Sequence, residues 1–355
     1  MRSLNLFCLA WLAVGGAAQQ MPTGLLGFNS GATKDNNDPK KQSDFQAEFT
    51  TARGLRGSPG VFNSVRLYTM IQAGTTTDPI SAFPAALATN TTMLLGIWCS
   101  GTETIENELT AMRNAIDRFG QQFADLVVGI SVGSEDLYRL SESGIKNKAG
   151  LGQGPDILVR FIREVRDAIN GTILAGKPVG HVDSWSALAN ESNSRVVDEL
   201  DWLGTDLYPY YESDKGNDPS NTTNVFDYIY NVSLNATRGK PLWVTETGHP
   251  TSGPKFGEAV ASVSNAAQYW QDVGCNRLFG RVNTWWYNLR DSNPANAEKF
   301  AITQDLSTTA KFNLTCAPNS GAPAAVNLVS GARSLHETQV LWAVVAVLVG
   351  VVFVS

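Results

Sequence analysis

Two glutamates stand at the ends of apolar, strand-like runs and are the residues best suited to chemistry. Glu135 ends the run LVVGISVGSE, and Glu246 lies in the stretch WVTETGHPTSG. In a parallel barrel the loops after the strands build the active face, so both acids would lie where catalysis takes place. Two carboxylates about 5 Å apart are the pair that retaining glycosidases use, one as acid/base and one as nucleophile. Taken singly, each acid has a plainer interpretation. Glu246 could be a helix cap or a solvated loop residue, and Glu135 could be a cap or a salt-bridged acid.

Eight apolar runs recur along the chain with helical stretches between them. Their hydrophobicity is continuous rather than alternating, which is typical of strands buried on both faces of a parallel sheet. The runs are GLLGFNS, SVRLYT, TMLLGIWC, LVVGISVGS, PVGHVDSW, DWLGTDLY, PLWVTET and RVNTWWY. Since no G-x-G-x-x-G fingerprint of an open doubly wound sheet is present, the alternation predicts a single α/β domain, a (β/α)8 TIM barrel.

Helical patterns separate the runs. Apolar residues at helical spacing predict a helix from Ile105 to Phe119, with Gly120 as its C-terminal stop. A second helix is predicted to begin at Pro155 and to end at Asn170. In such a barrel the ends of the fourth and seventh strands face one another across the mouth, so the two glutamates can flank one bond.

The motifs together resemble those of the fungal members of glycoside hydrolase family 17, the 1,3-β-glucanases and glucanosyltransferases of the cell wall. The resemblance covers nearly the whole mature chain and rests on GFNSGA, VRLYT, LLGIW, VGSED, DWLGTDLYPYYE and WVTETGHPTSG. It implies a (β/α)8 barrel and retaining cleavage of β-glucan, with Glu135 as the acid/base and Glu246 as the nucleophile. Tyr208 matches the tyrosine of strand six that leans on the nucleophile.

The chain departs from the wider family pattern at two strand ends. Many members read Gly-Asn-Glu at strand four, where this chain has Ser134 before Glu135, so a weaker or water-mediated contact to a sugar hydroxyl is expected. An aromatic-Glu-Ala-Phe segment at strand eight is replaced by NTWWYNLRDSN, so an auxiliary acid is missing. Trp285, Trp286 and Tyr287 are expected to offer sugar-stacking faces instead, with one of the two tryptophans in the core because neighbours on a strand point opposite ways.

Strand two carries further candidates. Tyr68 is predicted to bind substrate, and Arg66 is predicted to support the site, with the two side chains pointing opposite ways. An arginine inside a barrel needs a carboxylate partner, and Glu246 is the expected one. Tyr208 is also predicted to bind substrate, although it has the alternative of packing as a loop aromatic on the following proline. Asp136 is expected to be structural.

Three functions remain open on these residues. The favoured one is hydrolysis of internal 1,3-β-glucosidic bonds of cell-wall β-glucan through a glycosyl-enzyme. A 1,3-β-glucanosyltransferase would use the same residues, and a surface barrel that binds glucan without turnover is the third, which the intact glutamates Glu135 and Glu246 disfavour. The expected partner is 1,3-β-glucan, and a monomer is expected.

Composition excludes several other classes. The net charge of −6 argues against a nucleic-acid partner, which needs clustered Lys and Arg. His181 and His249 lie near neither a cysteine nor another histidine in sequence, so no metal-site spacing is present and no metal or cofactor is expected.

The two ends of the chain predict processing. Residues 1–18 run from one Arg through an apolar stretch to small residues, the order of a cleaved secretory signal rather than of a buried helix. Residues 331–355 end in an uncharged apolar tail, which predicts exchange for a glycosylphosphatidylinositol anchor at Ser330, with a plain single-span tail as the alternative. Residues 317–330 predict a tether and residues 19–316 the barrel. The expected location is the extracellular side of the cell membrane and the cell wall.

Export also bears on the cysteines and asparagines. Cys8 leaves with the signal, and of the three remaining cysteines Cys99 is expected to be buried and free, whereas Cys275 and Cys316 are expected to form a disulfide. Seven Asn-x-Ser/Thr sequons predict surface glycosylation at several of their sites. These sites are Asn90, Asn170, Asn190, Asn221, Asn231, Asn235 and Asn313.

Overall fold

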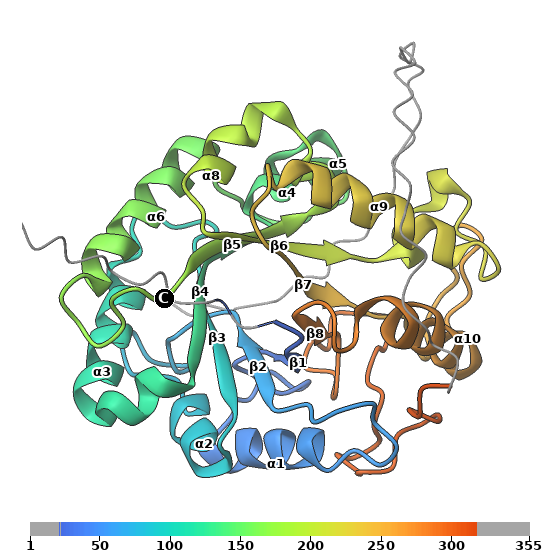
Figure 1. Cartoon of the computed structure of the whole chain (residues 1–355), viewed down its shortest axis with the longest axis horizontal. Coiled ribbons are helices and arrows are strands. Elements are labelled where there is room, and N and C mark those ends of the chain that lie inside the picture. Colours follow the sequence, from blue (N-terminus) through green and yellow to red (C-terminus); the bar gives the residue numbers. More distant parts are fainter. Residues whose placement is uncertain (1–20, 22, 318–355) are drawn as a thin grey trace, which may run out of the picture.

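Eight parallel strands close into a barrel in the computed structural model, which describes residue 21 and residues 23–317 (Figure 1). Each strand pairs with its neighbours in chain order, and β1 closes the barrel against β8. Every predicted run contains one strand, so the (β/α)8 fold class is confirmed. The strands are β1 (Leu26–Ser30), β2 (Ser64–Leu67), β3 (Thr92–Ile97), β4 (Val127–Ser134), β5 (Val179–Ser184), β6 (Trp202–Leu207), β7 (Leu242–Thr247) and β8 (Thr284–Trp286).

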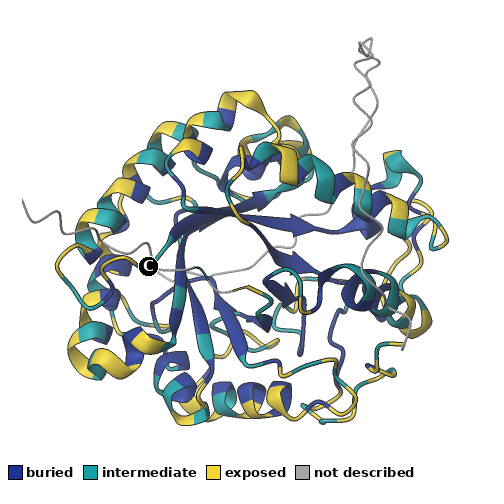
Figure 2. Cartoon of the chain, in the orientation of Figure 1, coloured by how far each residue is buried: buried dark blue, intermediate teal, exposed yellow. Residues whose placement is uncertain are grey.

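Helices surround the strands and turn their exposed side outward (Figure 2). The α-helices are α1 (Gln42–Arg53), α2 (Ala82–Thr89), α3 (Glu106–Leu126), α4 (Asp136–Leu140), α5 (Glu142–Lys146), α6 (Pro155–Ile169), α7 (Trp185–Leu188), α8 (Ser194–Asp198), α9 (Thr222–Ala236) and α10 (Val263–Tyr269). Shorter or irregular helical segments are η1 (Glu191–Asn193), η2 (Pro209–Tyr211), η3 (Ser213–Lys215) and η4 (Trp270–Leu278).

The two helices expected from periodicity are present, with one correction. α6 begins at Pro155 and gives way at Asn170, as predicted, and buries an apolar stripe. The predicted stop at Gly120 is confirmed as a break in the helix, but a second helical stretch follows it directly, so that α3 as a whole runs to Leu126. Gly120 interrupts α3 with φ 56° and ψ −148°, a conformation that only glycine adopts readily, but the chain resumes helical geometry after it.

Large side chains fill the barrel interior toward the amino-terminal ends of the strands. Trp202 and Trp243 stack at 4.0 Å between ring centroids, and Trp285 packs against Trp243 at 5.8 Å. Met21 and Leu25, which precede β1, pack against this group. The amino-terminal end of the barrel is therefore closed by tryptophans, which leaves polar chemistry to the carboxyl ends of the strands.

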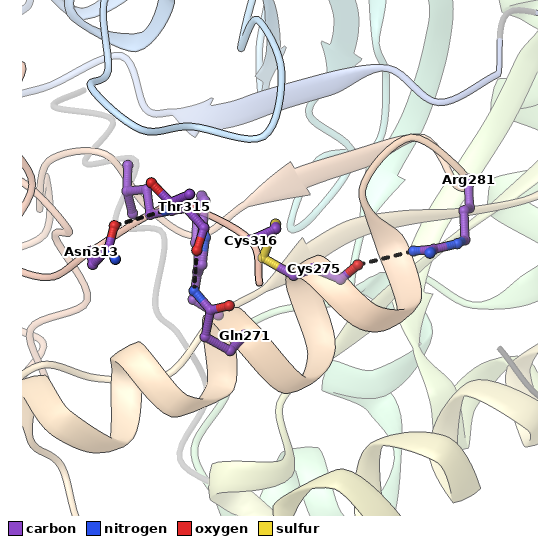
Figure 3. Close-up of a disulfide and its surroundings, with 8 residues drawn as sticks. Gln271, Cys275, Arg281, Asn313, Thr315 and Cys316 are labelled. Atoms are coloured by element: carbon purple, nitrogen blue, oxygen red, sulfur yellow. Dashed lines mark hydrogen bonds between the residues drawn. A yellow bond between two sulfur atoms is a disulfide. The ribbon is translucent and has the colours of Figure 1, made fainter. Parts of the chain in front are cut away.

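Cys275 of η4 and Cys316 form a disulfide with a Cα–Cα distance of 5.4 Å, and Cys99 is buried and free. Both findings agree with the sequence expectations. Figure 3 shows the Gln271 side chain donating to the Thr315 carbonyl beside this bond, at 2.9 Å. The final described segment is thus fastened to η4 by a covalent bond and by polar contacts.

The sequons lie on the outside of the molecule, as expected, and five of these asparagines are exposed. The exceptions are Asn221 and Asn231, which are partly buried. The Asn221 amide donates hydrogen bonds to the carbonyls of Lys215 and Gly216, at 3.2 and 2.6 Å. Its nitrogen is therefore engaged in the fold.

The segments predicted to be processed lie outside the described residues. These are the signal at residues 1–18, the tether from residue 318 onward and the anchor site Ser330 with the tail that follows it. Within the described residues, no helix is long and apolar enough to cross a membrane.

Candidate active site

Glu246 lies at the carboxyl end of β7, buried under three hydrogen-bond donors. Arg66 Nη1 donates to its Oε1 at 2.6 Å and the Tyr68 hydroxyl to the same oxygen at 2.5 Å. The Tyr208 hydroxyl donates to Oε2 at 2.7 Å. Three converging donors stabilise the negative charge of this carboxylate and fix its orientation. The expected contacts of Arg66 and Tyr208 with Glu246 are therefore present.

The expectation that Arg66 and Tyr68 point opposite ways is wrong. Both side chains reach the same carboxylate oxygen of Glu246. Residues two apart on a strand share a face, so the alternation of the strand itself requires this arrangement. Tyr68 binds Glu246 directly, and the Arg66 guanidinium lies 4.7 Å from the centre of its ring.

Arg66 connects four strands of the barrel mouth. Its Nη1 also donates to Asn29 Oδ1 at 3.0 Å, and its Nη2 donates to Ser134 Oγ at 2.9 Å. Asn29 is held in turn, because its amide donates to the backbone carbonyls of Thr245 and Trp285. Ser134, predicted to meet a sugar hydroxyl, thus uses its oxygen to hold the arginine that orients the β7 carboxylate.

Glu135 follows β4 directly and occupies the N-cap position of α4. Its carboxylate lies 3.5 Å from Arg139 Nη2, one helical turn further on. Burial raises the pKa of Glu135 to about 8, against the opposing charge of Arg139 and with a contribution from the negative charge of Glu246. The structure therefore brings the two glutamates into electrostatic contact, and Glu135 holds its proton at neutral pH.

A third carboxyl group, which the sequence analysis did not single out, borders Glu246. Asp206 of β6 is paired in register with Glu246 of β7 and accepts a hydrogen bond from the Thr245 hydroxyl at 2.8 Å. Burial, and then the charge of Glu246, raise its pKa well above the usual range, against the opposing charge of Arg66. Asp206 stands two residues before Tyr208 in the sequence and therefore points to the same face of the strand. This spacing was the signal that could have identified it as a site residue.

The predicted sugar-stacking role of two tryptophans does not fit the structure. Trp285 is 0% exposed and Trp286 is 2% exposed. Trp285 points into the barrel, where its Nε1 donates to Ser64 Oγ, and Trp286 packs outward against Trp270, with 4.9 Å between ring centroids. The two rings point to opposite sides of β8, as predicted, but other side chains cover both sides. Neither ring is therefore available to a sugar.

Tyr287, the last aromatic of this group, lies at the mouth of the barrel. It packs against Tyr208 and Phe300, with ring centroids 6.0 and 5.3 Å away. Burial, and then the negative charge of Glu246, raise the pKa of its hydroxyl. Its position beside the carboxylates is compatible with the predicted substrate contact.

The contacts of Asp136 are structural. Asp136, as expected, is buried and accepts from the Ser134 backbone amide at 2.9 Å and from the Ser100 hydroxyl at 2.6 Å. Among the described residues, no group of three or more His, Cys, Asp or Glu side chains is arranged to hold a metal ion.

A barrel with these acids at its mouth matches one known family. Residues 27–304 match the model of the BtgE/BtgC glycoside hydrolase domain. This chain belongs to the BtgE/BtgC glycoside hydrolase family. The family membership expected from the strand motifs is confirmed, and it covers β1 through the segment after β8.

Two fungal relatives illustrate the similarity. "Probable glucan endo-1,3-beta-glucosidase eglC" of Aspergillus oryzae is 53% identical over 301 residues, which are 84% of this chain and 64% of that protein. The protein of the same name from Emericella nidulans is 49% identical over 297 residues, 83% of this chain and 63% of that protein. The chain thus spans less than two thirds of the length of these relatives.

Solved structures share the fold. A β-1,3-glucanosyltransferase of Rhizomucor miehei, described as an active-site mutant in complex with laminaritriose, superposes with a TM-score of 0.64 at 23% identity, covering 82% of this chain and 97% of that one. CJP38, a β-1,3-glucanase of Cryptomeria japonica pollen, gives a TM-score of 0.58 at 15% identity, covering 80% and 98%. At these identities the likeness concerns the barrel alone.

Proposed function

We propose that this chain is a retaining glycoside hydrolase that cleaves internal 1,3-β-glucosidic bonds of cell-wall β-glucan. The observation that carries the proposal is the contrast between two neighbouring acids. Glu246 is surrounded by three donors that stabilise a carboxylate, whereas burial keeps Glu135 protonated at neutral pH. A nucleophile and a proton donor on the two sides of one bond need this division.

The two acids act together on one glycosidic bond, in two steps. Glu246 attacks the anomeric carbon while Glu135 gives its proton to the leaving oxygen, so the C–O bond breaks and a glycosyl ester forms. Glu135, now ionised, removes a proton from an incoming water, whose oxygen displaces Glu246 from the anomeric carbon. Arg66 and the two tyrosines hold the carboxylate in the attacking orientation and stabilise the charge that returns to it.

The substrate class rests on the relatives. Proteins about half identical to this chain carry the name glucan endo-1,3-beta-glucosidase, and the matching family model spans residues 27–304, which include the site residues. The named site residues all belong to this chain, and we propose that the monomer is active.

Products from laminari-oligosaccharides of defined length test the reaction. An endo-hydrolase releases shorter oligosaccharides throughout the time course. Products longer than the starting material would instead assign a glucanosyltransferase, in which a glucan hydroxyl replaces water. Binding of the oligosaccharide with no new product over a long incubation would assign a non-catalytic barrel.

Azide rescue tests the two roles separately. Replacing Glu135 by Ala should spare substrates with a good leaving group, whereas glucan cleavage falls by about 10²–10⁴-fold, the usual contribution of a general acid. Replacing Glu246 by Ala should abolish both reactions because no glycosyl-enzyme forms. Azide should yield the β-glycosyl azide with Glu135→Ala and the α-glycosyl azide with Glu246→Ala, and the same β-product from both would contradict the assignment.

We also propose that the protein works at the extracellular side of the cell membrane and in the cell wall, held by a glycosylphosphatidylinositol attached at Ser330. The support is the order of residues at the two ends of the sequence, with a secretory signal first and an apolar tail after small residues last. A phosphatidylinositol-specific phospholipase should release the protein from membranes. A membrane-bound mature chain that still carries residues 331–355 after this treatment would disprove the anchor.

A further inference from the structure

The turn that presents Glu135 has a backbone that needs support. Glu135 has φ 56° and ψ 26°, the left-handed region that side chains with a Cβ disfavour. Gly133, two residues earlier, has φ 84°, and a Cβ there would lie 2.3 Å from Asp136 Oδ2. Such a conformation persists only where the surroundings hold it in place.

Asp183 of β5 supplies part of that support. Its Oδ2 accepts from the backbone amide of Leu137 at 2.8 Å, and its Oδ1 accepts from Tyr138 at 3.1 Å. Oδ1 also accepts from the amide of Ser184 at 2.8 Å. Two of these amides belong to the helical turn that follows Glu135, so the position of the Asp183 carboxylate fixes the direction in which α4 leaves the catalytic glutamate.

His181 lies beneath this carboxylate with both ring nitrogens engaged. Nδ1 is 2.7 Å from the Val132 carbonyl oxygen and Nε2 is 3.0 Å from Asp183 Oδ2. A carbonyl oxygen only accepts, so Nδ1 carries a proton. The proton between Nε2 and Asp183 remains to be placed on one partner or the other.

The hydrogen bonds to Asp183 decide where that proton resides. Three backbone amides donate to its two oxygens, so both oxygens act as acceptors. An ionised carboxylate has no proton to give, so Nε2 must donate. Both ring nitrogens then carry protons, which makes the ring a cation that is 0% exposed.

We propose that His181 is a permanent imidazolium and that, paired with Asp183, it is a positioning residue for the Glu135 turn. The pair lies on the outer side of the strands, between β5 and α4, and has no place in the chemical steps. The Asp183 carboxylate accepts hydrogen bonds from α4, and the positive charge of His181 compensates its negative charge. The effect of the pair on catalysis rests on the proposed role of Glu135, whereas the protonation state of His181 does not.

The charges around His181 are consistent with a cation. Asp183 lies on its own strand and Asp136 on α4, and both carboxylates favour the protonated ring against the effect of burial, so the pKa of His181 is raised. Arg139 of α4 and the Glu135 carboxyl group also belong to this corner. On β6, Asp206 stands opposite Ser184 in the register but interacts most strongly with Glu246. The buried faces of α6 and α7 contribute only apolar side chains.

Nitrogen-15 NMR of the full chain labelled at histidine tests the protonation state directly. At about pH 7.5, above the usual histidine pKa of about 6.5, His181 should show two protonated ring nitrogens. His249 serves as the internal reference, because burial lowers its pKa to about 4 and leaves it a neutral ring. His181→Gln and His249→Gln variants assign their signals, and the signal that remains in the full chain belongs to His336, its third histidine. A neutral ring at His181 would overturn the proposal, whatever the enzyme's substrate proves to be.

The pH profile of kcat/KM tests the positioning role. His181→Gln removes a positive charge near Glu135, so the basic limb of the profile should move to higher pH. Asp183→Asn removes a negative charge that raises the pKa of Glu135 together with the acceptor that requires the second ring proton of His181, so the same limb should move less than in His181→Gln. In both variants kcat should fall by about tenfold to a hundredfold with little change in KM, the cost of a slightly misplaced catalytic group.

The control is His249→Gln, which removes a buried neutral ring and should leave the basic limb in place. A limb that stays in place in His181→Gln, with folding intact, would mean that no cation was removed and would overturn the proposal. If neither the wild type nor any variant cleaves glucan, the proposed function fails, and the NMR result then decides the imidazolium alone.

Discussion

At the residue scale, the uncharged state of Glu135 comes at a cost in stability. Its pKa is raised from 4.5 to about 8 in the folded protein, so between these values the folded state retains a proton that the unfolded state releases. The free energy of unfolding therefore falls as the pH rises through this window, by at most about 1.4 kcal/mol for each pH unit. The proposed role of Glu135 as proton donor needs a raised pKa, whereas the raised pKa lowers the free energy of unfolding as the pH rises.

Glu135→Gln should consequently raise the melting temperature near pH 8 and have little effect near pH 4.5, where the folded protein keeps the glutamate protonated and the unfolded chain is only partly ionised. Thermal unfolding at the two pH values measures this. Glu142→Gln, an exposed change on the neighbouring α5, is the matched control and should be neutral at both. A gain of the same size at both pH values would disconnect it from titration of Glu135.

Arg66 is one of the three donors that orient Glu246. Its planar group donates to Glu246, Asn29 and Ser134 at once, which the single ammonium of lysine cannot reproduce. Arg66→Lys should therefore lower kcat by about 10- to 100-fold, the worth of one charged hydrogen bond. Steady-state kinetics measure this, with the exposed Arg163→Lys as control. Activity within about twofold of the wild type would show that charge alone is sufficient at this position.

At the element scale, α3 ties together two loops of the catalytic face through one buried acid. Glu108 accepts from the Thr69 hydroxyl at 2.5 Å, the Met70 amide at 2.8 Å and the Trp98 amide at 3.3 Å. Thr69 follows Tyr68, and the Arg139 guanidinium lies 5.3 Å from the centre of the Trp98 ring. The loops after β2 and β3 thus share an acceptor, although one supports Glu246 and the other supports Glu135.

Glu108→Ala should lower the free energy of unfolding by at least about 2 kcal/mol, because two buried donors, the Thr69 hydroxyl and the Met70 amide, lose their acceptor at about 1–3 kcal/mol each when unpaired, and the partly buried Trp98 residue loses an acceptor too. Urea unfolding measures the change. Glu106→Ala, two residues earlier on the same helix but exposed, should fall within about 0.5 kcal/mol of the wild type. Equal losses in the two variants would indicate an effect on helix α3 rather than on the loops.

The elements were predictable from the sequence to the extent that the signal was local. Each strand is a continuous apolar run because parallel strands are buried on both faces, and Glu135 and Glu246 were found because they lie at the ends of such runs. Local patterns do not report which side of a strand is covered. Trp285 and Trp286 were therefore assigned to the substrate although both lie in the core.

The supporting residues of the site escaped prediction for a related reason. Asp183 contacts α4 and Glu108 contacts two loops only after the barrel has closed. The spacing of these residues in the sequence predicts neither contact. Arg66 was the exception, because a buried arginine demands an acid and the sequence offered one. Tertiary hydrogen bonds between separate elements, rather than the catalytic pair itself, are what sequence reasoning could not supply.

At the scale of the whole molecule, the Cys275–Cys316 disulfide joins residues 41 positions apart and encloses β8. Cys275→Ala with Cys316→Ala should lower the free energy of unfolding by about 2–4 kcal/mol, mainly by freeing the unfolded chain. Urea unfolding measures it, and the wild type under reducing conditions is the companion sample. Since neither cysteine contacts Glu135 or Glu246, kcat at low temperature should remain unchanged. A large loss of kcat in a folded variant would mean that the bond also shapes the mouth of the barrel.

The same bond determines how the barrel responds to tension. A pull on the chain beyond residue 317 reaches Cys316 first, and the sulfur bridge passes the load to η4 instead of peeling away the segment after β8. While the bridge is intact, the stretch between the two cysteines is withheld from extension, roughly 140 Å of contour length for a separation of 41 residues. Single-molecule extension in the presence and absence of a reductant would show that length appear. If the proposed C-terminal anchor is present, a load on it would leave β8 in register for as long as this bond holds.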